Sequence, residues 1–187
     1  MTLNNYYLNK KGLALVVIDV QDSLVKAMRP EVSEFVIRDI GILIHTAKTL
    51  EFPILYTEQY PRGLKRTIPF IRRALETLEP FEKITFSAVR DQGFMDGLSV
   101  LGLTQLIVTG MESHVCVFQT VLDLLARGYL VHVPQDAVCS RTKQNWRTGL
   151  ALMERAGAVM TSTETIVFQL FERAGTEAFK AIAPLIK

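Results

Sequence analysis

The hydrophobic positions of the chain alternate between short continuous runs and longer segments of helical period. The short runs are rich in Val, Ile and Leu and cover residues 13–18, 53–56, 105–109, 130–133 and 158–160. Runs of this length and composition are typical of strands buried on both faces of a parallel sheet. We therefore expect five such strands.

Longer amphipathic segments lie between these runs. Apolar side chains spaced by three and four residues predict helices over 35–50, 115–126 and 146–156, with a shorter one over 94–101. Gly128 and Gly157 follow two of them and are placed to end a helix. The last segment, 166–185, predicts one or two helices packed on an edge.

Strands that alternate with helices predict βαβ units and a doubly wound, mostly parallel sheet covered on both faces. The chain has 187 residues and shows no internal repeat, low-complexity tract or linker. That length fits one domain, and we expect residues 1–187 to form a single α/β unit.

Composition excludes several classes of function. The 21 Lys and Arg residues nearly balance the 19 Asp and Glu residues, which gives no electrostatic reason to expect nucleic acid or an anionic membrane as partner. No apolar run approaches the roughly 20 residues of a membrane helix. The N-terminal dodecapeptide lacks the apolar core of a signal peptide, and two cysteines are too few for a disulfide framework. A cytoplasmic protein with free thiols is the expectation.

Polar residues that follow the predicted strands are the candidates for chemistry, because ligands of such sheets bind beyond the carboxyl ends of the strands. Asp19 follows the first strand, residues 57–60 the second, 110–116 the third, and Gln135 and Asp136 the fourth. These loops are expected to converge on one cleft.

Cys116 lies near the start of a predicted helix, where unpaired N–H groups and the helix dipole favour a thiolate. The nucleophile and an inert buried cysteine are about equally supported by this position. Asp19 ends the most apolar strand and fits either a working carboxylate or a loop-tying residue. Lys83 taken alone reads as a solvated surface charge.

Other chemistries find little support. His114 lies two residues from Cys116, where the two side chains diverge, so a Cys–His dyad is not expected. The three scattered histidines and the absence of a CxxC or HxxxH pair argue against a metal site. No glycine-rich phosphate loop follows a strand, so no cofactor is expected.

Together these residues resemble the isochorismatase-like hydrolases, also called the cysteine hydrolase superfamily. The resemblance covers residues 14–164 and is carried by ALVVIDVQDS around Asp19, EKITFSAV around Lys83, VTGMESHVCVFQTVLDLLARGY around Cys116, and VPQDAVCSR. It implies a Rossmann-like three-layer α/β/α sandwich and an Asp19–Lys83–Cys116 triad. The loop EQYPRGL resembles a branch that includes isochorismatase domain-containing proteins and small bacterial hydrolases of unassigned substrate.

The resemblance also implies a cis peptide bond at Met111–Glu112, which would aim the Glu112 N–H beside the Cys116 N–H as an oxyanion hole. Two departures from the family narrow the activity. The loop TEQYPRG lacks the metal-binding histidines of nicotinamidases, and the presence of Cys116 distinguishes the chain from isochorismatases that lack a cysteine.

The resulting hypothesis is a cysteine-dependent hydrolase of a small amide or related C–N bond, acting through a thioester. Asp19 is the expected general base, and Lys83 is expected to lower the thiol pKa. Gln59, Tyr60, Phe86 and Ser87 are candidate substrate-binding residues, although ordinary loop packing explains each equally well. Two alternatives stay open: a vinyl ether hydrolase that depends on Asp19, and a non-catalytic scaffold. The resemblance further implies a homo-oligomer.

Overall fold

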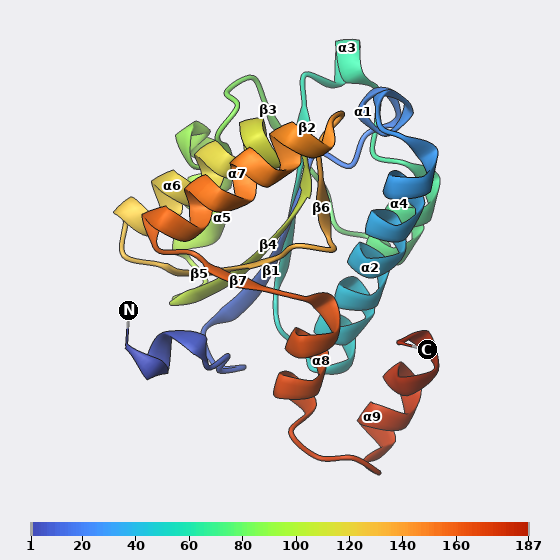
Figure 1. Cartoon of the computed structure of the whole chain (residues 1–187), viewed down its shortest axis with the longest axis vertical. Helices are drawn as coiled ribbons and strands as arrows, with labels where there is room; N and C mark the ends of the chain where they lie inside the picture. The colour runs from blue at the N-terminus through green and yellow to red at the C-terminus, as the bar shows by residue number, and fades with distance from the viewer. Residues whose placement is uncertain (1, 187) are drawn as a thin grey trace.

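The computed structural model describes residues 2–186, and its centre is one sheet of seven strands (Figure 1). The strand order is β3-β2-β1-β4-β5-β7, and every named pair is parallel. Strand β4 pairs with β5 along its first residues and with β6 at its last two residues. The strands are β1 (Leu13–Ile18), β2 (Ile54–Gln59), β3 (Phe81–Lys83), β4 (Gln105–Met111), β5 (Leu130–Pro134), β6 (Val138–Cys139) and β7 (Val159–Thr161).

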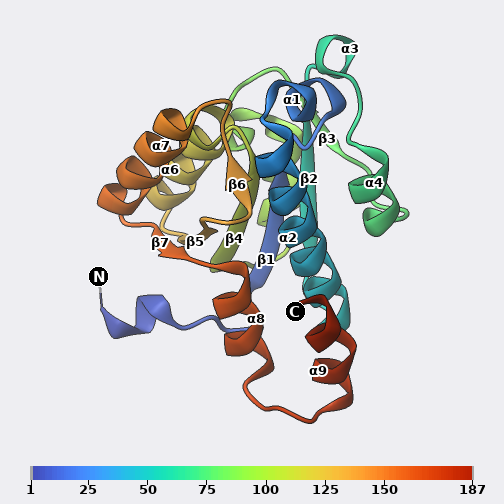
Figure 2. The same ribbon diagram turned by 45° about the vertical axis from the view of Figure 1, so that its right-hand side comes forward.

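Helices cover both faces of the sheet, as the two ribbon views show (Figures 1 and 2). One face carries α5 (Gln92–Ser99), α6 (Phe118–Ala126) and α7 (Lys143–Ala156), and the other carries α2 (Pro30–Thr49), α4 (Pro69–Leu75) and α8 (Thr163–Phe171). Helix α9 (Glu177–Ile182) packs against α2. The predicted α/β/α sandwich is confirmed.

The alternation of side chains along β1 explains why the sheet needs both helical layers. Leu13, Leu15 and Val17 join the core beneath α2, α4 and α8, whereas Ala14, Val16 and Ile18 join the core beneath α5, α6 and α7. All six residues of β1 are buried. Strands buried on both faces read as continuous apolar runs, which is the pattern of residues 13–18.

Short elements complete the two ends of the sheet. Helices α1 (Asp22–Ala27) and α3 (Pro61–Leu64) lie at the end of the molecule where β1 and β2 terminate (Figure 1). The single-turn elements are η1 (Leu3–Tyr6), η2 (Ala88–Arg90), the π-helical turn η3 (Ser113–Val117) and η4 (Ala183–Leu185).

Most of the predicted elements are present with shifted boundaries. Helix α2 begins at Pro30, five residues before the predicted start, because proline fits the first helical position. The predicted helix 115–126 divides into η3 and α6, and the C-terminal segment forms the two helices α8 and α9. Gly157 ends α7 in a left-handed conformation, as expected.

Two strands were not predicted. Strand β3 has three residues and β6 has two, and such short strands leave no hydrophobic pattern to detect. Lys83, which taken alone would be a solvated surface charge, is instead a buried residue of β3. No helix within residues 2–186 combines the length and apolar character needed to cross a bilayer.

The sheet changes direction of winding between β1 and β4. The chain proceeds from β1 to β2 on one side of this pair and from β4 to β5 on the other. A crevice for ligands forms at such a switch point, beyond the carboxyl ends of the strands. Asp19 directly follows β1, and Cys116 follows β4 within η3.

Candidate active site

Asp19 is a wholly buried carboxylate at the end of β1. The Thr57 hydroxyl donates to Asp19 Oδ1 at 2.6 Å, and Lys83 Nζ donates to Oδ2 at 2.7 Å. The backbone of Asp19 has a φ of 49°, in the left-handed region that aspartate tolerates better than most residues. Both carboxylate oxygens are thus held by neighbouring strands.

Lys83 is among the largest fully buried side chains of the described residues, and it is 1% exposed. Its ammonium donates to Asp19 Oδ2, to Gln59 Oε1 at 2.8 Å, and to the carbonyls of Thr85 and Phe86 at 3.3 and 3.2 Å. A buried ammonium is tolerated only when paired and hydrogen-bonded, and these four oxygens satisfy that requirement.

A pair of glutamines fixes the end of β2 beside Lys83. Gln59 Nε2 donates to the Ile84 carbonyl at 2.7 Å, so both ends of the Gln59 amide are occupied by the segment around Lys83. Gln21 Oε1 accepts from the Gln59 backbone N–H at 2.7 Å, and its Nε2 donates to the Gln59 and Lys65 carbonyls. Gln59 therefore contributes to holding the Lys83 ammonium at the end of β2.

Cys116 lies in the turn that follows β4, and the peptide bond Met111–Glu112 before it is cis. Gly110 has a φ of +110°, and a Cβ at this position would lie 2.0 Å from the carbonyl oxygen of Ile18. Only glycine allows this contact between the ends of β4 and β1. The approach brings the Cys116 turn next to Asp19.

Burial raises the pKa of the Cys116 thiol to about 12. The next contribution is the Asp19 carboxylate, which stabilises the protonated thiol as a nearby charge and as a hydrogen-bond acceptor. Lys83 acts in the opposite direction, as expected, but its effect is smaller. The prediction of a lowered thiol pKa is therefore wrong, because desolvation and Asp19 outweigh the ammonium.

The raised pKa has a consequence for catalysis. Loss of the thiol proton to solvent leaves a net negative charge in a buried site, whereas its transfer to Asp19 leaves the total charge unchanged. The arrangement of Asp19, Lys83 and Cys116 therefore disfavours a resting thiolate but permits a proton to pass from sulfur to carboxylate during reaction.

The residues expected to bind substrate divide into two groups. Gln59 and Ser87 are buried, and the Ser87 carbonyl accepts from the Thr85 hydroxyl at 2.8 Å. Tyr60 and Phe86 are 50% and 55% exposed and lie on the loops that follow β2 and β3. The Tyr60 N–H donates to the Lys83 carbonyl at 2.9 Å, so these two loops are adjacent.

The remaining thiol and histidines lie outside this cluster of functional groups. Cys139 is free and wholly buried on β6, where burial raises the pKa of its thiol to about 12. His114 Nδ1 is 3.0 Å from the Ser140 hydroxyl rather than directed at Cys116. Within residues 2–186, no group of three or more His, Cys, Asp or Glu side chains is arranged to hold a metal ion.

Two residues of the site, Thr57 and Gln21, carry roles that the sequence alone did not assign. Thr57 stood among the polar residues expected after the second strand, and Gln21 within the string ALVVIDVQDS, but neither was given a role of its own. The one sequence signal for Thr57 is its polar side chain directly after the apolar run 53–56. Their partners are 38 residues away in the chain, so the pairing requires the fold.

Fold and site together define an α/β protein with a buried carboxylate, ammonium and thiol at the switch point of its sheet. The isochorismatase domain model matches residues 13–165, and the chain belongs to the isochorismatase family. Mouse isochorismatase domain-containing protein 2A is 35% identical over 176 residues, which are 92% of this chain and 82% of that protein.

Solved structures agree with this assignment. The structure of the Caenorhabditis elegans MAR1 ribonuclease has a TM-score of 0.88 and 35% identity, covering 96% of this chain and 92% of that one. The ycaC gene product of Escherichia coli, described as an octameric hydrolase of unknown specificity, has a TM-score of 0.84 over 97% of this chain and 87% of that one. At 19% identity, the latter likeness concerns the fold alone.

Proposed function

We propose that the chain is a cysteine-dependent hydrolase of a small amide or related C–N bond, with Asp19, Lys83 and Cys116 as its catalytic triad. One observation carries the proposal: the Asp19 carboxylate is sealed from solvent, is paired with Lys83 at 2.7 Å, and stabilises the proton on the Cys116 thiol. A nucleophile beside a base that a cation holds in place can carry out acyl transfer.

The reaction follows from these positions. Asp19 takes the Cys116 proton as sulfur attacks the carbonyl carbon, and the carbonyl electron pair moves to oxygen. The oxyanion returns that pair to carbon, the C–N bond breaks, and Asp19 gives its proton to the departing nitrogen. Water then attacks the thioester, with Asp19 again as base, and the released thiolate recovers a proton.

Lys83 holds the Asp19 carboxylate in place through its 2.7 Å hydrogen bond to Oδ2 while the proton moves on and off Asp19. The backbone N–H groups of Glu112 and Cys116 are the proposed oxyanion hole. In the described part of the chain no hydrogen bond has the Glu112 N–H as donor, which supports its availability for an oxyanion. Such a donor contributes about 3–4 kcal/mol to transition-state stabilisation in well-studied hydrolases.

Tyr60 and Phe86 are the proposed side-chain walls of the substrate site, because their half-exposed rings stand on the loops next to Lys83. Gln59 and Ser87 support those loops from within. A small substrate with an apolar acyl group fits rings of this kind. The metal-independent reaction proposed here needs no cofactor.

The decisive experiment is a screen of small amides for ammonia or amine release, followed by Cys116→Ala and Cys139→Ala on every hit. We expect Cys116→Ala to abolish turnover and Cys139→Ala to retain it. Mass spectrometry of the quenched wild type is expected to find the acyl group on the Cys116 peptide. Amide turnover that survives Cys116→Ala rejects Cys116 as the nucleophile. The vinyl ether alternative is assayed separately on isochorismate, where it predicts that Cys116→Ala stays active and Asp19→Ala does not.

RNA cleavage is a further arm of the screen, because the C. elegans neighbour is named a ribonuclease. The Lys83 ammonium, the cation of the site, already donates to four oxygens and has nothing left for a phosphate. This favours a neutral amide over a phosphodiester. RNA cleavage that is lost in Cys116→Ala would reverse the preference.

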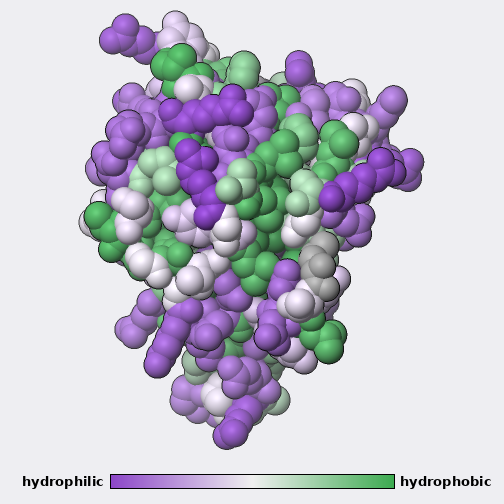
Figure 3. Space-filling view, turned by 90° about the vertical axis from the view of Figure 1, so that its left-hand side faces the viewer, coloured by the Kyte–Doolittle hydropathy of each residue, from purple (hydrophilic) through white to green (hydrophobic). Residues whose placement is uncertain are grey.

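We also propose a homo-oligomer in the cytoplasm. Hydrophobic side chains gather in the middle of one face of the molecule (Figure 3). Several large apolar side chains are more than half exposed, among them Leu3, Tyr7, Phe35 and Val100. The two free cysteines agree with a reducing compartment. Light scattering on the purified protein measures the number of subunits, and cell fractionation tests the location.

A further inference from the structure

Glu112 carries a nearly buried carboxylate in the turn that contains Cys116, and Arg141 is its hydrogen-bond and ion-pair partner. Glu112 Oε2 accepts two hydrogen bonds of 3.0 Å, one from the Arg141 backbone N–H and one from its guanidinium Nε. The Glu112 side chain is 8% exposed, so its charge is largely removed from water and depends on this partner.

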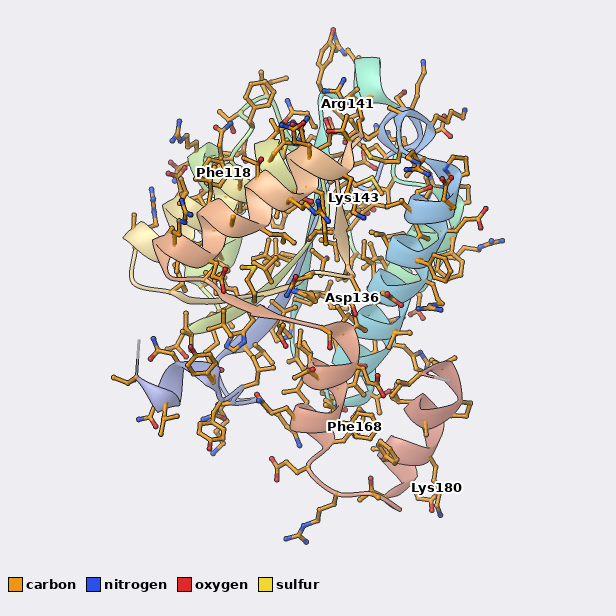
Figure 4. All side chains as sticks on the ribbon, in the orientation of Figure 1. Phe118, Asp136, Arg141, Lys143, Phe168 and Lys180 are labelled. Atoms are coloured by element: carbon orange, nitrogen blue, oxygen red, sulfur yellow. The ribbon has the colours of Figure 1, made fainter. Side chains whose placement is uncertain are left out.

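Arg141 reaches Glu112 from a different part of the chain. It lies in the loop between β6 and α7, at the end of the molecule where α7 begins (Figure 4). Two further contacts join the same segments: β6 pairs with the end of β4 through Cys139 and Met111, and the Ser140 hydroxyl is 3.0 Å from His114 Nδ1. The loop therefore holds the turn on both sides of the cis peptide bond.

The Glu112 charge also bears on the nucleophile. The carboxylate raises the pKa of the Cys116 thiol, and it belongs to the residue whose N–H is the proposed oxyanion donor. A negative charge at this place opposes both the thiolate and the oxyanion. The Arg141 guanidinium is the cation that offsets it.

We propose that Arg141 is a positioning residue of the active site: it fixes the Glu112–Cys116 turn and neutralises the Glu112 charge while that turn presents the nucleophile. The catalytic part of this inference rests on the proposed function, whereas the clamp itself is a property of the turn. Its effect reaches the reaction through Glu112, since Arg141 has no contact with Asp19 or Lys83 among the hydrogen bonds of the described residues.

The test compares Arg141→Met with Arg38→Met. Arg38 pairs with Asp39 on α2, and the exposed fractions of that pair, 56% and 7%, nearly equal the 56% and 8% of Arg141 and Glu112. The two variants thus remove equivalent ion pairs, of which one adjoins the Cys116 turn. Rates of Cys116 alkylation by iodoacetamide are measured by mass spectrometry from pH 7 to 9.

We expect Arg141→Met to slow alkylation about tenfold or more across this pH range, whereas Arg38→Met reacts like the wild type. A displaced nucleophile and an uncompensated neighbouring charge both act in this direction. The double variant Glu112→Gln/Arg141→Met removes the unpaired charge and is expected to recover much of the lost rate. A purely structural role for Arg141 predicts no recovery, and equal rates in Arg141→Met and Arg38→Met overturn the proposal.

Amide hydrogen exchange over residues 112–116 gives a readout that needs no reactive thiol. The exchange is expected to accelerate in Arg141→Met and to stay unchanged in Arg38→Met; unchanged exchange in both rejects the clamp. The outcomes separate the two proposals. If Cys116 alkylation slows in Arg141→Met but the wild type hydrolyses no amide, the role of Arg141 stands and the proposed hydrolase is rejected. If the wild type hydrolyses amides and Arg141→Met does so equally well, the hydrolase stands and the role of Arg141 is rejected.

Discussion

Lys83 Nζ and Asp19 Oδ2 lie 2.7 Å apart, and neither side chain has any exposure to solvent. An ion pair sealed in this way contributes little net stability, because desolvation of both charges offsets their attraction. Its position at the carboxyl ends of the strands, where Asp19 and Lys83 both act on the Cys116 thiol, agrees with the proposed catalytic role rather than with a role in stability.

Removal of one partner is nevertheless costly. Lys83→Met leaves the Asp19 carboxylate buried without its cation, and we expect a loss of about 3–5 kcal/mol in the free energy of unfolding. Urea denaturation measures this loss. Lys26→Met is the matched control: its pair with Asp22, also 2.7 Å long, is exposed, and its removal is expected to cost less than about 1 kcal/mol. Equal losses of stability in Lys83→Met and Lys26→Met would contradict the expected cost of leaving Asp19 buried without its cation.

The hydroxyl of Thr57 is expected to orient the general base. It donates to Asp19 Oδ1 at 2.6 Å, and hydrogen bonds to charged groups contribute about 1.5–3 kcal/mol. Thr57→Val should therefore lower both stability and amide turnover, the latter about tenfold or more. Thr46→Val serves as control, because the buried Thr46 hydroxyl donates to the Ile42 carbonyl within α2. Stability falls in the control as well, but turnover should be retained.

The sequence contained most of the fold because its strands are buried on both faces. Residues 13–18 form β1 with the predicted boundaries, since an uninterrupted apolar run is what two helical layers require. Strands β3 and β6 escaped prediction because two or three residues hold no period. These short strands receive their conformation from neighbours that the fold supplies.

The sequence indicated which residues to consider for the site, but not the direction in which the pKa of the Cys116 thiol is shifted. Asp19, Lys83 and Cys116 were the candidates, and the fold places their segments at the carboxyl ends of strands in one sheet, with Lys83 Nζ 2.7 Å from Asp19 Oδ2. The direction of the Cys116 pKa shift depends on how completely the thiol is desolvated. Gln59 was named as a candidate substrate-binding residue, and nothing in the sequence indicated that its amide also makes hydrogen bonds with Lys83 and Ile84. The burial of a side chain and its hydrogen-bond partners depend on tertiary packing, which cannot be read from the sequence pattern.

The raised thiol pKa makes stability depend on alkaline pH. The pKa of Cys116 is about 12 in the folded chain, above the ordinary 9.0, so the folded state retains this proton when the unfolded state has lost it. The stabilisation is complete below pH 9 and is lost as the pH rises toward 12, with a limiting slope of about 1.4 kcal/mol per pH unit.

Cys116→Ala should remove that slope from the alkaline limb. Between pH 8 and 10 we expect the wild type to lose about 1–1.5 kcal/mol more than Cys116→Ala in the free energy of unfolding. Urea titrations at both pH values under reducing conditions measure the difference. Cys139→Ala should show a similar reduction, because burial raises its pKa as well. Parallel pH dependence in the wild type and both variants would mean that the folded thiols ionise normally.

Gly149 shows how closely α7 supports the Cys116 turn. A Cβ at this position would lie 2.7 Å from the Ser113 carbonyl oxygen and 3.0 Å from the His114 nitrogen, and both are backbone atoms that cannot move aside. Gly149→Ala should therefore displace the helix from the turn. We expect a loss of about 1–3 kcal/mol in stability from overpacking, despite the gain of about 1 kcal/mol in helix propensity.

Gly41→Ala is the control for Gly149→Ala. Gly41 lies within α2, where a new Cβ meets the ring of Phe70 at 3.0 Å, and that ring is half exposed and free to turn. Thermal unfolding should find this variant unchanged or slightly stabilised. If Gly149→Ala is also unchanged in stability and in amide turnover, the contact with α7 does not stabilise the Cys116 turn. The turn is then held by the Glu112–Arg141 pair and by β6. A fall in both quantities in Gly149→Ala, with Gly41→Ala unaffected, makes α7 a necessary support of the Cys116 turn.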